Sequence, residues 1–190
     1  MTRQPALQSF LDTSVMALRA AARGPALTAA ETVIRRWSSI GSPGPGAARL
    51  PVCDWIAPAV AGASPQRAAL AGAFAAIESR LHWVRRASAR KSEQTFWNGH
   101  ANAVILGPGG LERRDDLWVG VTVMAPGVLC VDHSHPPEEV YLSLSPGEWW
   151  NEKIDWTDPG PEEAFYNPPG ITHAMRSGAG PFLALWYLPL

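Results

Sequence analysis

The most constraining feature of this sequence is its second half, where short β-rich or alternating segments are separated by glycine, proline and charged turns. We predict strands there over residues 81–84, 102–106, 117–124, 128–132, 139–144, 164–167, 173–176 and 182–188. Many short strands with turns between them are typical of an antiparallel barrel or sandwich. This half of the chain is therefore predicted to be mainly β.

The first third of the chain has the composition of helices. Alanine, leucine and arginine dominate residues 7–22 and 26–37, and Thr28 followed by Glu31 predicts a capping box. The glycine- and proline-rich run 41–46 then predicts a loop that breaks regular structure.

One more helix is predicted over residues 66–79, with Ser64-Pro65 as its N-cap and first helical position. Helices followed by strands indicate an α-helical N-terminal extension, residues 1–80, packed on a β domain, residues 81–190. With 190 residues, 46% of them apolar and 17% charged, the chain can bury one sizeable core. We expect one compact unit.

The charge balance argues against two classes of partner. Lys plus Arg is 16 and Asp plus Glu is 17, so no basic surface is predicted for nucleic acid or an anionic membrane. Neither a signal peptide nor an apolar run of the ~18 residues that span a bilayer is visible. Cys53 and Cys130 are expected to be buried thiols in a reducing compartment, which makes the cytoplasm the expected location.

The segment 127–139 carries the pattern G-x5-H-x-H-x3-E. His133 and His135 are two residues apart, so on a strand they would project from the same face. Glu139 and Tyr141 share their odd parity, as does Ser143. If the two prolines at 136 and 137 do not shift the register, these ligands and a tyrosine hydroxyl point into one cavity.

A third histidine follows in the turn Pro-Pro-Gly-Ile-Thr-His173. His133, His135, Glu139 and His173 together offer three imidazoles and one carboxylate. This donor set suits one divalent metal ion such as Zn, Fe(II), Mn, Co or Ni and leaves one or two positions open for water or substrate. We therefore predict a metal site.

The two remaining histidines, His82 and His100, lack such partners. They are interpreted as a surface histidine or a hydrogen-bonded core histidine rather than as ligands.

These two segments resemble the two conserved motifs of the cupin superfamily. Three departures lie outside the ligands: seven residues instead of six between Glu139 and Gly147, no glycine five residues before Pro168, and Ser177 in place of an asparagine. The resemblance implies a mainly β fold, the cupin double-stranded β-helix (jelly-roll) barrel, here with an α-helical N-terminal extension.

A narrower resemblance is to the cupin-type dimethylsulfoniopropionate lyases, in particular the DddQ-like group. It is carried by three segments, His-Ser-His-Pro-Pro-Glu-Glu-Val-Tyr (133–141), Leu-Ser-Pro-Gly-Glu-Trp-Trp (144–150) and Tyr-Asn-Pro-Pro-Gly-Ile-Thr-His-Ala-Met (166–175). The resemblance implies a carbon–sulfur lyase that cleaves dimethylsulfoniopropionate to dimethyl sulfide and acrylate.

Such a β-elimination needs a base, and something to absorb charge on the substrate carboxylate. The metal is expected to bind that carboxylate, and Tyr141 is assigned as the general base at the position of the family's catalytic tyrosine. The alternative for Tyr141 is a core or ligand-sphere residue without a proton-transfer role. Aromatic faces suit the sulfonium cation, and the candidates are Trp149, Trp150, Tyr166 and Trp186.

Two other functions stay open at this point. An Fe(II)-dependent cupin dioxygenase would use the same ligands with O2, and a non-enzymatic cupin would bind a small ligand or store metal. The apolar helical region also leaves three roles open: it covers the barrel, pairs with a second copy in a homodimer, or acts as a lid.

Overall fold

The computed structural model of the chain describes residues 2–190. Its helices are α1 (Pro5–Ala21), α2 (Gly24–Arg36), the 3-10 helix η1 (Pro51–Trp55), α3 (Ile56–Ala61), α4 (Ala68–Glu78) and α5 (Gln94–Gly99). Its strands are β1 (Ser42–Pro43), β2 (His100–Leu106), β3 (Glu112–Arg113), β4 (Leu117–Met124), β5 (Leu129–His133), β6 (Glu139–Ser143), β7 (Glu148–Asn151), β8 (Ile154–Thr157), β9 (Phe165–Asn167), β10 (His173–Arg176) and β11 (Phe182–Pro189).

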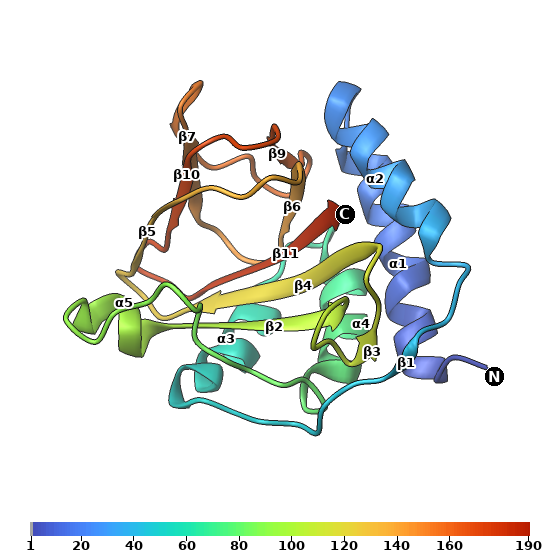
Figure 1. The fold of residues 1–190 in the computed structure, drawn as a ribbon. Helices are drawn as coiled ribbons and strands as arrows, with labels where there is room; N and C mark the ends of the chain where they lie inside the picture. Colours follow the sequence, from blue (N-terminus) through green and yellow to red (C-terminus); the bar gives the residue numbers. More distant parts are fainter. Residues whose placement is uncertain (1) are drawn as a thin grey trace.

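The strands form two sheets that enclose the interior of a barrel (Figure 1). The larger has seven strands in the order β1-β3-β2-β4-β11-β6-β9, and the smaller has four in the order β5-β10-β7-β8. Between the sheets, Tyr141 and Phe182 of the larger sheet share an apolar cluster with Cys130, Trp149 and Met175 of the smaller one.

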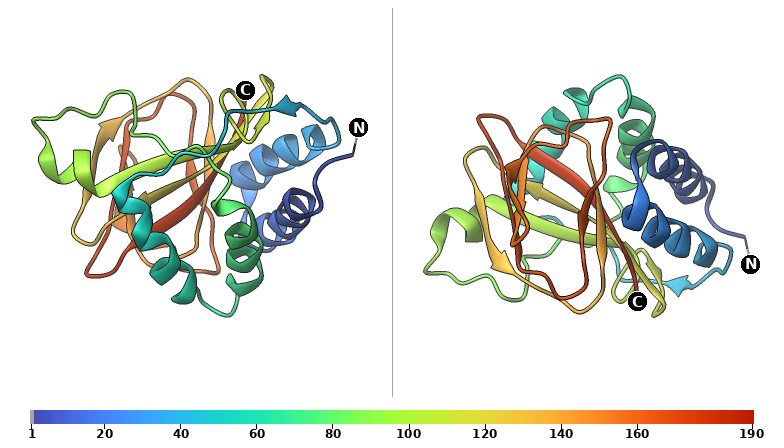
Figure 2. Two further views of the ribbon diagram at one scale, coloured as in Figure 1. Left: turned by 90° about the horizontal axis from the view of Figure 1, so that it is seen from below. Right: turned by 90° about the horizontal axis from the view of Figure 1, so that it is seen from above.

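The larger sheet is buried on both faces because side chains alternate along its strands. On β11, Ala184 and Trp186 belong to the barrel interior, whereas Leu183, Leu185 and Tyr187 belong to the core shared with the helices. Figure 2 shows helices α1 to α4, which we call the helical layer, gathered on one side of the barrel.

Helix α1 joins this layer through a stripe of apolar residues. Its buried positions include Leu7, Phe10, Leu11 and Leu18, a spacing that places them on one helical face. The buried Ser14 lies on the same face, and its Oγ accepts a hydrogen bond of 3.2 Å from the Tyr187 hydroxyl of β11.

The mainly β barrel with an α-helical extension is confirmed. Strands β4 and β10 have the predicted bounds, and the other predicted helices and strands that form differ by at most two residues at either end. The exception is 81–84, which makes only two isolated bridges, Ala48 with His82 and Val84 with Asn102.

Three further local predictions are wrong. The capping box of Thr28 and Glu31 does not form, because α2 already begins at Gly24 and the Thr28 hydroxyl donates to the Gly24 carbonyl. Ser64 is not the N-cap of α4, which is preceded by Arg67. The run 41–46 is not irregular throughout, since β1 pairs with β3.

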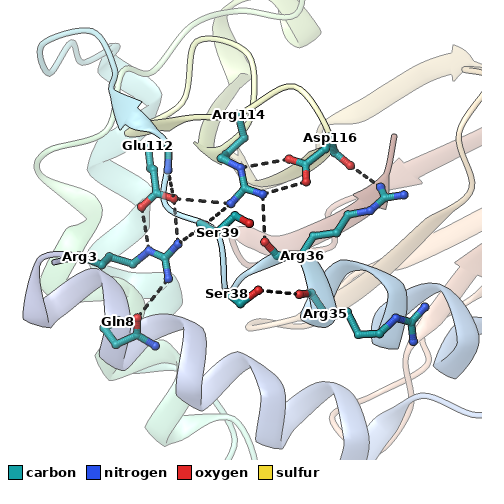
Figure 3. A network of polar contacts seen from close by, with 10 residues as sticks. Arg3, Gln8, Arg35, Arg36, Ser38, Ser39, Glu112, Arg114 and Asp116 are labelled. Carbon is teal, nitrogen blue, oxygen red and sulfur yellow. Dashed lines mark hydrogen bonds and ion pairs between the residues drawn. The ribbon is translucent and has the colours of Figure 1, made fainter. Parts of the chain in front are cut away.

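A buried ion network ties the N-terminal segment to the barrel (Figure 3). Glu112 of β3 accepts hydrogen bonds of 2.7 and 2.9 Å from the Arg3 guanidinium and one of 3.0 Å from the Gly41 amide. Arg114 lies 3.9 Å from Glu112 and forms an ion pair of 2.8 Å with Asp116. The network therefore holds the N-terminal residues against the β3–β4 connection.

Across residues 2–190, no helix combines the length and hydropathy needed to cross a bilayer.

Candidate metal centre

Three of the four predicted ligands come from the ends of three strands, and the fourth comes from a connection between two of them. His133 is the last residue of β5, Glu139 is the first of β6, His173 is the first of β10, and His135 lies in the β5–β6 connection. Because β5 and β10 are antiparallel neighbours with His133 opposite His173, the two imidazole rings lie only 4.1 Å apart between centroids.

The turn before His173 is fastened to the connection that carries His135. The Gly170 amide donates a hydrogen bond of 3.0 Å to the His135 carbonyl oxygen. Gly170 has φ +72°, a left-handed conformation that a glycine adopts without the strain of a β-carbon. The Pro-Pro-Gly turn thus sets the position of both histidines.

Three of the four side chains converge closely. Ligand atoms of His135, Glu139 and His173 all lie within 4.8 Å of one another. Glu139 Oε2 is 3.1 Å from His135 Nε2 and 3.3 Å from His173 Nε2. His133 lies outside this close cluster, although its ring adjoins that of His173.

The hydrogen bonds of the imidazoles leave their Nε2 atoms as acceptors. Nδ1 of His133, His135 and His173 lies 3.1, 2.9 and 3.1 Å from the carbonyl oxygens of Val131, Pro137 and Ile171. A carbonyl oxygen only accepts, so each Nδ1 carries the ring hydrogen and each Nε2 of a neutral ring presents a lone pair.

Two lone pairs and a carboxylate oxygen therefore face one another. The buried Nε2 of His173 makes no hydrogen bond to any residue in 2–190. Acceptors at such short distances repel unless a cation lies between them, either a proton or a metal ion. The donor set and its backbone hydrogen bonds fit a divalent transition metal.

The pKa values of His133 and Glu139 favour the protonation states that bind a metal, a neutral imidazole and an ionised carboxylate. Burial, with the nearby His173 and Arg86, lowers the pKa of His133 to about 3, so this ring is neutral at neutral pH. Burial acts to raise the pKa of Glu139, but its contacts with His135 and His173 outweigh it and lower the pKa to about 2. Burial acts to lower the pKa of His135, yet the carboxylate of Glu139 raises it overall.

A cavity of about 570 Å³ opens beside this cluster. His133, His135, Glu139 and Tyr141 all line it, as the shared parity predicted, whereas Ser143 does not. Tyr141 is buried on β6 directly opposite Trp186 of β11. Burial and the Glu139 charge raise the pKa of Tyr141 well above 10, and Arg86 acts in the opposite direction.

Of the four aromatic candidates for the sulfonium, only Trp186 lines this cavity. Its ring packs over Gly120 of β4, where an added β-carbon would lie 2.2 Å from the indole. Trp118 meets it edge to face at 5.8 Å and also lines the cavity.

The other three candidates are placed elsewhere. Trp149 is buried in the inter-sheet core against Phe165 and Phe182. Trp150, its neighbour on β7, is half-buried, and Tyr166 donates a hydrogen bond of 2.6 Å to Glu138. None of the three is part of the cavity lining.

Sequence reasoning missed Arg86. Its guanidinium lines the cavity and donates to Cys130 Sγ and to the Val131 carbonyl, both at 3.3 Å, while its buried Nε has no partner among residues 2–190. The Arg86 amide donates a hydrogen bond of 3.0 Å to His100 Nε2. No motif around Arg86 signals this placement, since only the fold brings residue 86 to β5.

His100 has the hydrogen-bonded core position that was one of its two predicted readings. It is buried, stacks on Phe96 with ring centroids 3.7 Å apart, and uses both ring nitrogens in hydrogen bonds. His82 bonds the Gly46 carbonyl at 2.8 Å through Nδ1.

Comparison with known proteins gives consistent matches. The sequence profile of a family described as dimethylsulfoniopropionate lyase matches residues 29–184. The dimethylsulfoniopropionate lyase DddQ of Ruegeria pomeroyi is 30% identical over 119 residues, which are 62% of this chain and 59% of that protein. The aligned part thus spans about three fifths of this relative.

Two solved structures share the fold over nearly the whole chain. The crystal structure of the DMSP lyase DddQ from Ruegeria pomeroyi superposes with a TM-score of 0.76 at 27% identity, covering 99% of this chain and 93% of that one. A structure from work on the DMSP lyases RdDddP and RnDddQII gives 0.75 at 24% identity, with 97% and 92% covered. At that identity the second likeness concerns the fold alone.

Proposed function

The chain belongs to the dimethylsulfoniopropionate lyase family, and we propose that it cleaves dimethylsulfoniopropionate to dimethyl sulfide and acrylate by a metal-dependent β-elimination. The observation that carries the proposal is the convergence of His135, Glu139 and His173, two of which, His135 and Glu139, line a cavity together with Tyr141. The family match favours this elimination over the O2-dependent alternative and over a non-enzymatic cupin.

His133, His135, Glu139 and His173 would hold one divalent transition metal ion. Zn, Fe and Mn all accept this combination of imidazole and carboxylate. When bound, the metal supplies a Lewis acid for the substrate carboxylate, on which negative charge develops during proton removal. His133 adjoins the close cluster through its contact with His173, so we include it as the fourth ligand.

Tyr141 would act as the general base. In its phenolate form, Oη removes the proton from the carbon next to the carboxylate, the C–H electron pair becomes the new double bond, and the C–S pair leaves with sulfur. The balanced products are acrylate and neutral dimethyl sulfide, with the proton on Tyr141. Burial and the Glu139 charge raise the pKa of Tyr141 and so favour its neutral phenol, which means that a base role needs positive charge to lower that pKa. Arg86 acts in that direction, and a bound metal ion would do the same.

The two ends of the substrate have different partners in the cavity. The sulfonium has no hydrogen to donate, so it suits the indole faces of Trp118 and Trp186, each worth about 0.5–2 kcal/mol. The carboxylate suits the positive side of the cavity, where Arg86 would add its charge to that of a bound metal. Tyr141 lines the same cavity and would take the proton from the carbon next to the carboxylate.

The test combines metal analysis with an assay for the volatile product. Purified protein is analysed for bound metal and then incubated with dimethylsulfoniopropionate, and dimethyl sulfide is measured in the headspace. We expect stoichiometric metal and release of dimethyl sulfide with equimolar acrylate. Metal-loaded, folded protein that releases none would refute the proposed reaction.

Two histidine variants separate the metal site from general effects of mutation. His135→Ala should lose bound metal and activity together. His82→Ala removes a histidine that bonds the Gly46 carbonyl instead, and it should keep its metal. Equal metal content in the two variants would contradict the assigned ligand set.

A further inference from the structure

A second, smaller cavity lies at the junction of the helical layer and the barrel. It has a volume of about 100 Å³ and is lined by residues from the segment before α4, the end of β6 and the loop after β8, among them Ser64, Arg67, Ser143, Ser145 and Asp158. No residue lines both this cavity and the one beside the metal centre.

Arg67 is the unusual member of this lining. It is only 3% exposed, and its Nε and Nη2 have no hydrogen-bond partner among residues 2–190. No carboxylate oxygen in that range lies within the 4.0 Å of an ion pair. Guanidinium groups stay charged in proteins, so this is a buried positive charge without a contacting counter-charge. Burial lowers the pKa of Arg67, and the charge of Glu162, beyond ion-pair distance, acts in the opposite direction.

Of the serine hydroxyl groups that line this cavity, two donate hydrogen bonds to the backbone and one has no hydrogen-bond partner among residues 2–190. Ser143 Oγ donates to the Gly160 carbonyl at 3.1 Å, and Ser145 Oγ donates to the Pro181 carbonyl at 2.8 Å. Ser64 Oγ is buried and has no partner in the described part of the chain. Two guanidinium nitrogens and one hydroxyl are therefore left as donors at this cavity.

The charge and size of the cavity limit the ligand. Asp158 is exposed and also lines the cavity, and its Oδ1 accepts a hydrogen bond of 2.8 Å from the Gly160 amide. Its negative charge opposes a multivalent anion. Helix α4 begins at the next residue, Ala68, and its N-terminal dipole favours an anion.

We propose that this cavity binds one small monovalent anion, held by Arg67 Nε and Nη2 and by the Ser64 hydroxyl. Chloride and a short carboxylate such as acetate share the required chemistry. The anion would supply the missing counter-charge where α4 meets the end of β6, and it would thereby stabilise the docking of the helical layer. This inference does not depend on the proposed lyase reaction.

The first experiment measures thermal unfolding of the full-length, metal-loaded protein. Chloride replaces gluconate at constant ionic strength, and a parallel series uses acetate. Specific binding raises Tm along a saturation curve. A rise with chloride alone identifies chloride as the ligand, and a rise with both identifies the shared chemistry. The absence of a saturable rise with either anion would overturn the proposal.

Variants assign the effect to Arg67. Arg67→Met should lose the anion-dependent rise in Tm, whereas Arg90→Met, which removes the same charge from an exposed position, should retain it. Ser64→Ala should raise the half-saturating concentration about ten-fold by removing one hydrogen bond to a charged ligand. The same chloride response in Arg67→Met as in the parent protein would refute the site.

Crystals soaked in bromide provide a readout that does not require a folded Arg67 variant. We expect an anomalous peak within hydrogen-bond distance of Arg67 Nε and Nη2. A water molecule at that position, without an anomalous peak, would overturn the proposal.

Discussion

At the residue scale, the chemistry of the candidate metal centre depends on which nitrogen of each histidine carries the hydrogen. The backbone carbonyls of Val131, Pro137 and Ile171 fix the hydrogen on Nδ1, and this leaves Nε2 to bind a cation. The carbonyls are supplied by the same short segments that carry the histidines, so the tautomer and the ring orientation are set together.

Tyr141→Phe tests the proposed base. The hydroxyl is the only group removed, and the ring can keep its packing in the apolar cluster it shares with Trp149. We expect metal content and Tm close to those of the parent protein and a loss of turnover of about 10²–10⁴-fold, the usual contribution of a general base. Turnover within a few-fold of the parent value would remove Tyr141 as the base and leave the metal site unaffected.

Arg86→Met tests the proposed contact with the substrate carboxylate. Loss of a charged hydrogen bond should lower kcat/KM about 10–100-fold, mainly through KM, while bound metal is retained. The matched control is Arg85→Met, because Arg85 lines the same cavity but donates to the Trp97 carbonyl and packs over the Trp97 ring at 4.6 Å. Equal losses in the two variants would indicate a general electrostatic effect rather than a contact.

At the scale of elements, Glu112 shows how a two-residue strand can join distant parts of the chain. Strand β3 pairs with β1 and β2, and its Glu112 carboxylate receives the Arg3 side chain and the Gly41 amide. Burial acts to raise the pKa of Glu112, but these hydrogen bonds and the charges of Arg3 and Arg114 lower it overall.

A pKa below the unfolded value means that the ionised carboxylate stabilises the fold. This contribution is complete above pH ~4.5 and is lost as the pH falls through the folded pKa. Glu112→Gln should therefore lower the free energy of unfolding by about 1–3 kcal/mol at pH 7, with a smaller difference in acid.

Urea denaturation at pH 7 and at pH 4 measures both effects. Glu31→Gln is the control, since Glu31 pairs with the largely exposed Arg19 on the helical surface and should change stability little. A difference between parent and Glu112→Gln that grew on acidification would contradict the sign argued here.

At the scale of the whole molecule, the helices and the barrel share one core. Leu18 of α1 and Val33 of α2 belong to the same apolar cluster as Val121, Leu142 and Leu185 of the larger sheet. The division into residues 1–80 and 81–190 therefore describes the order of elements along the chain, and we propose that the two parts fold together.

This proposal predicts one cooperative unfolding transition for the full chain. Far-UV circular dichroism and tryptophan fluorescence should give coincident curves. A fragment of residues 81–190 should not fold alone, because its sheet would expose the apolar face that the helices cover. A folded fragment, or two separate transitions, would show that the barrel is independent of the helices. Sedimentation of the same samples distinguishes a monomer from the homodimer that was one of the three open roles of the helical region.

The sequence alone predicted a mainly β domain, the helical extension and four candidate ligand positions. These follow from local patterns: alternation sets a strand face, and Gly, Pro and His at fixed spacing set a turn. The predicted strands over 117–124 and 173–176 match β4 and β10 for this reason. Strand β7 was missed because its consecutive tryptophans, Trp149 and Trp150, show no polar alternation, although one is buried in the core and the other is half-buried.

Only the tertiary structure decided what surrounds the candidate metal centre. Trp118 and Trp186 lie on the neighbouring strands β4 and β11, and the segment before α5 brings Arg86 to the same cavity; no local pattern encodes this arrangement. The same holds for Arg67, whose position beside the end of β6 depends on the docking of α4. Ligand spacing is a short-range property of the chain, whereas the lining of a cavity depends on which distant strands become neighbours.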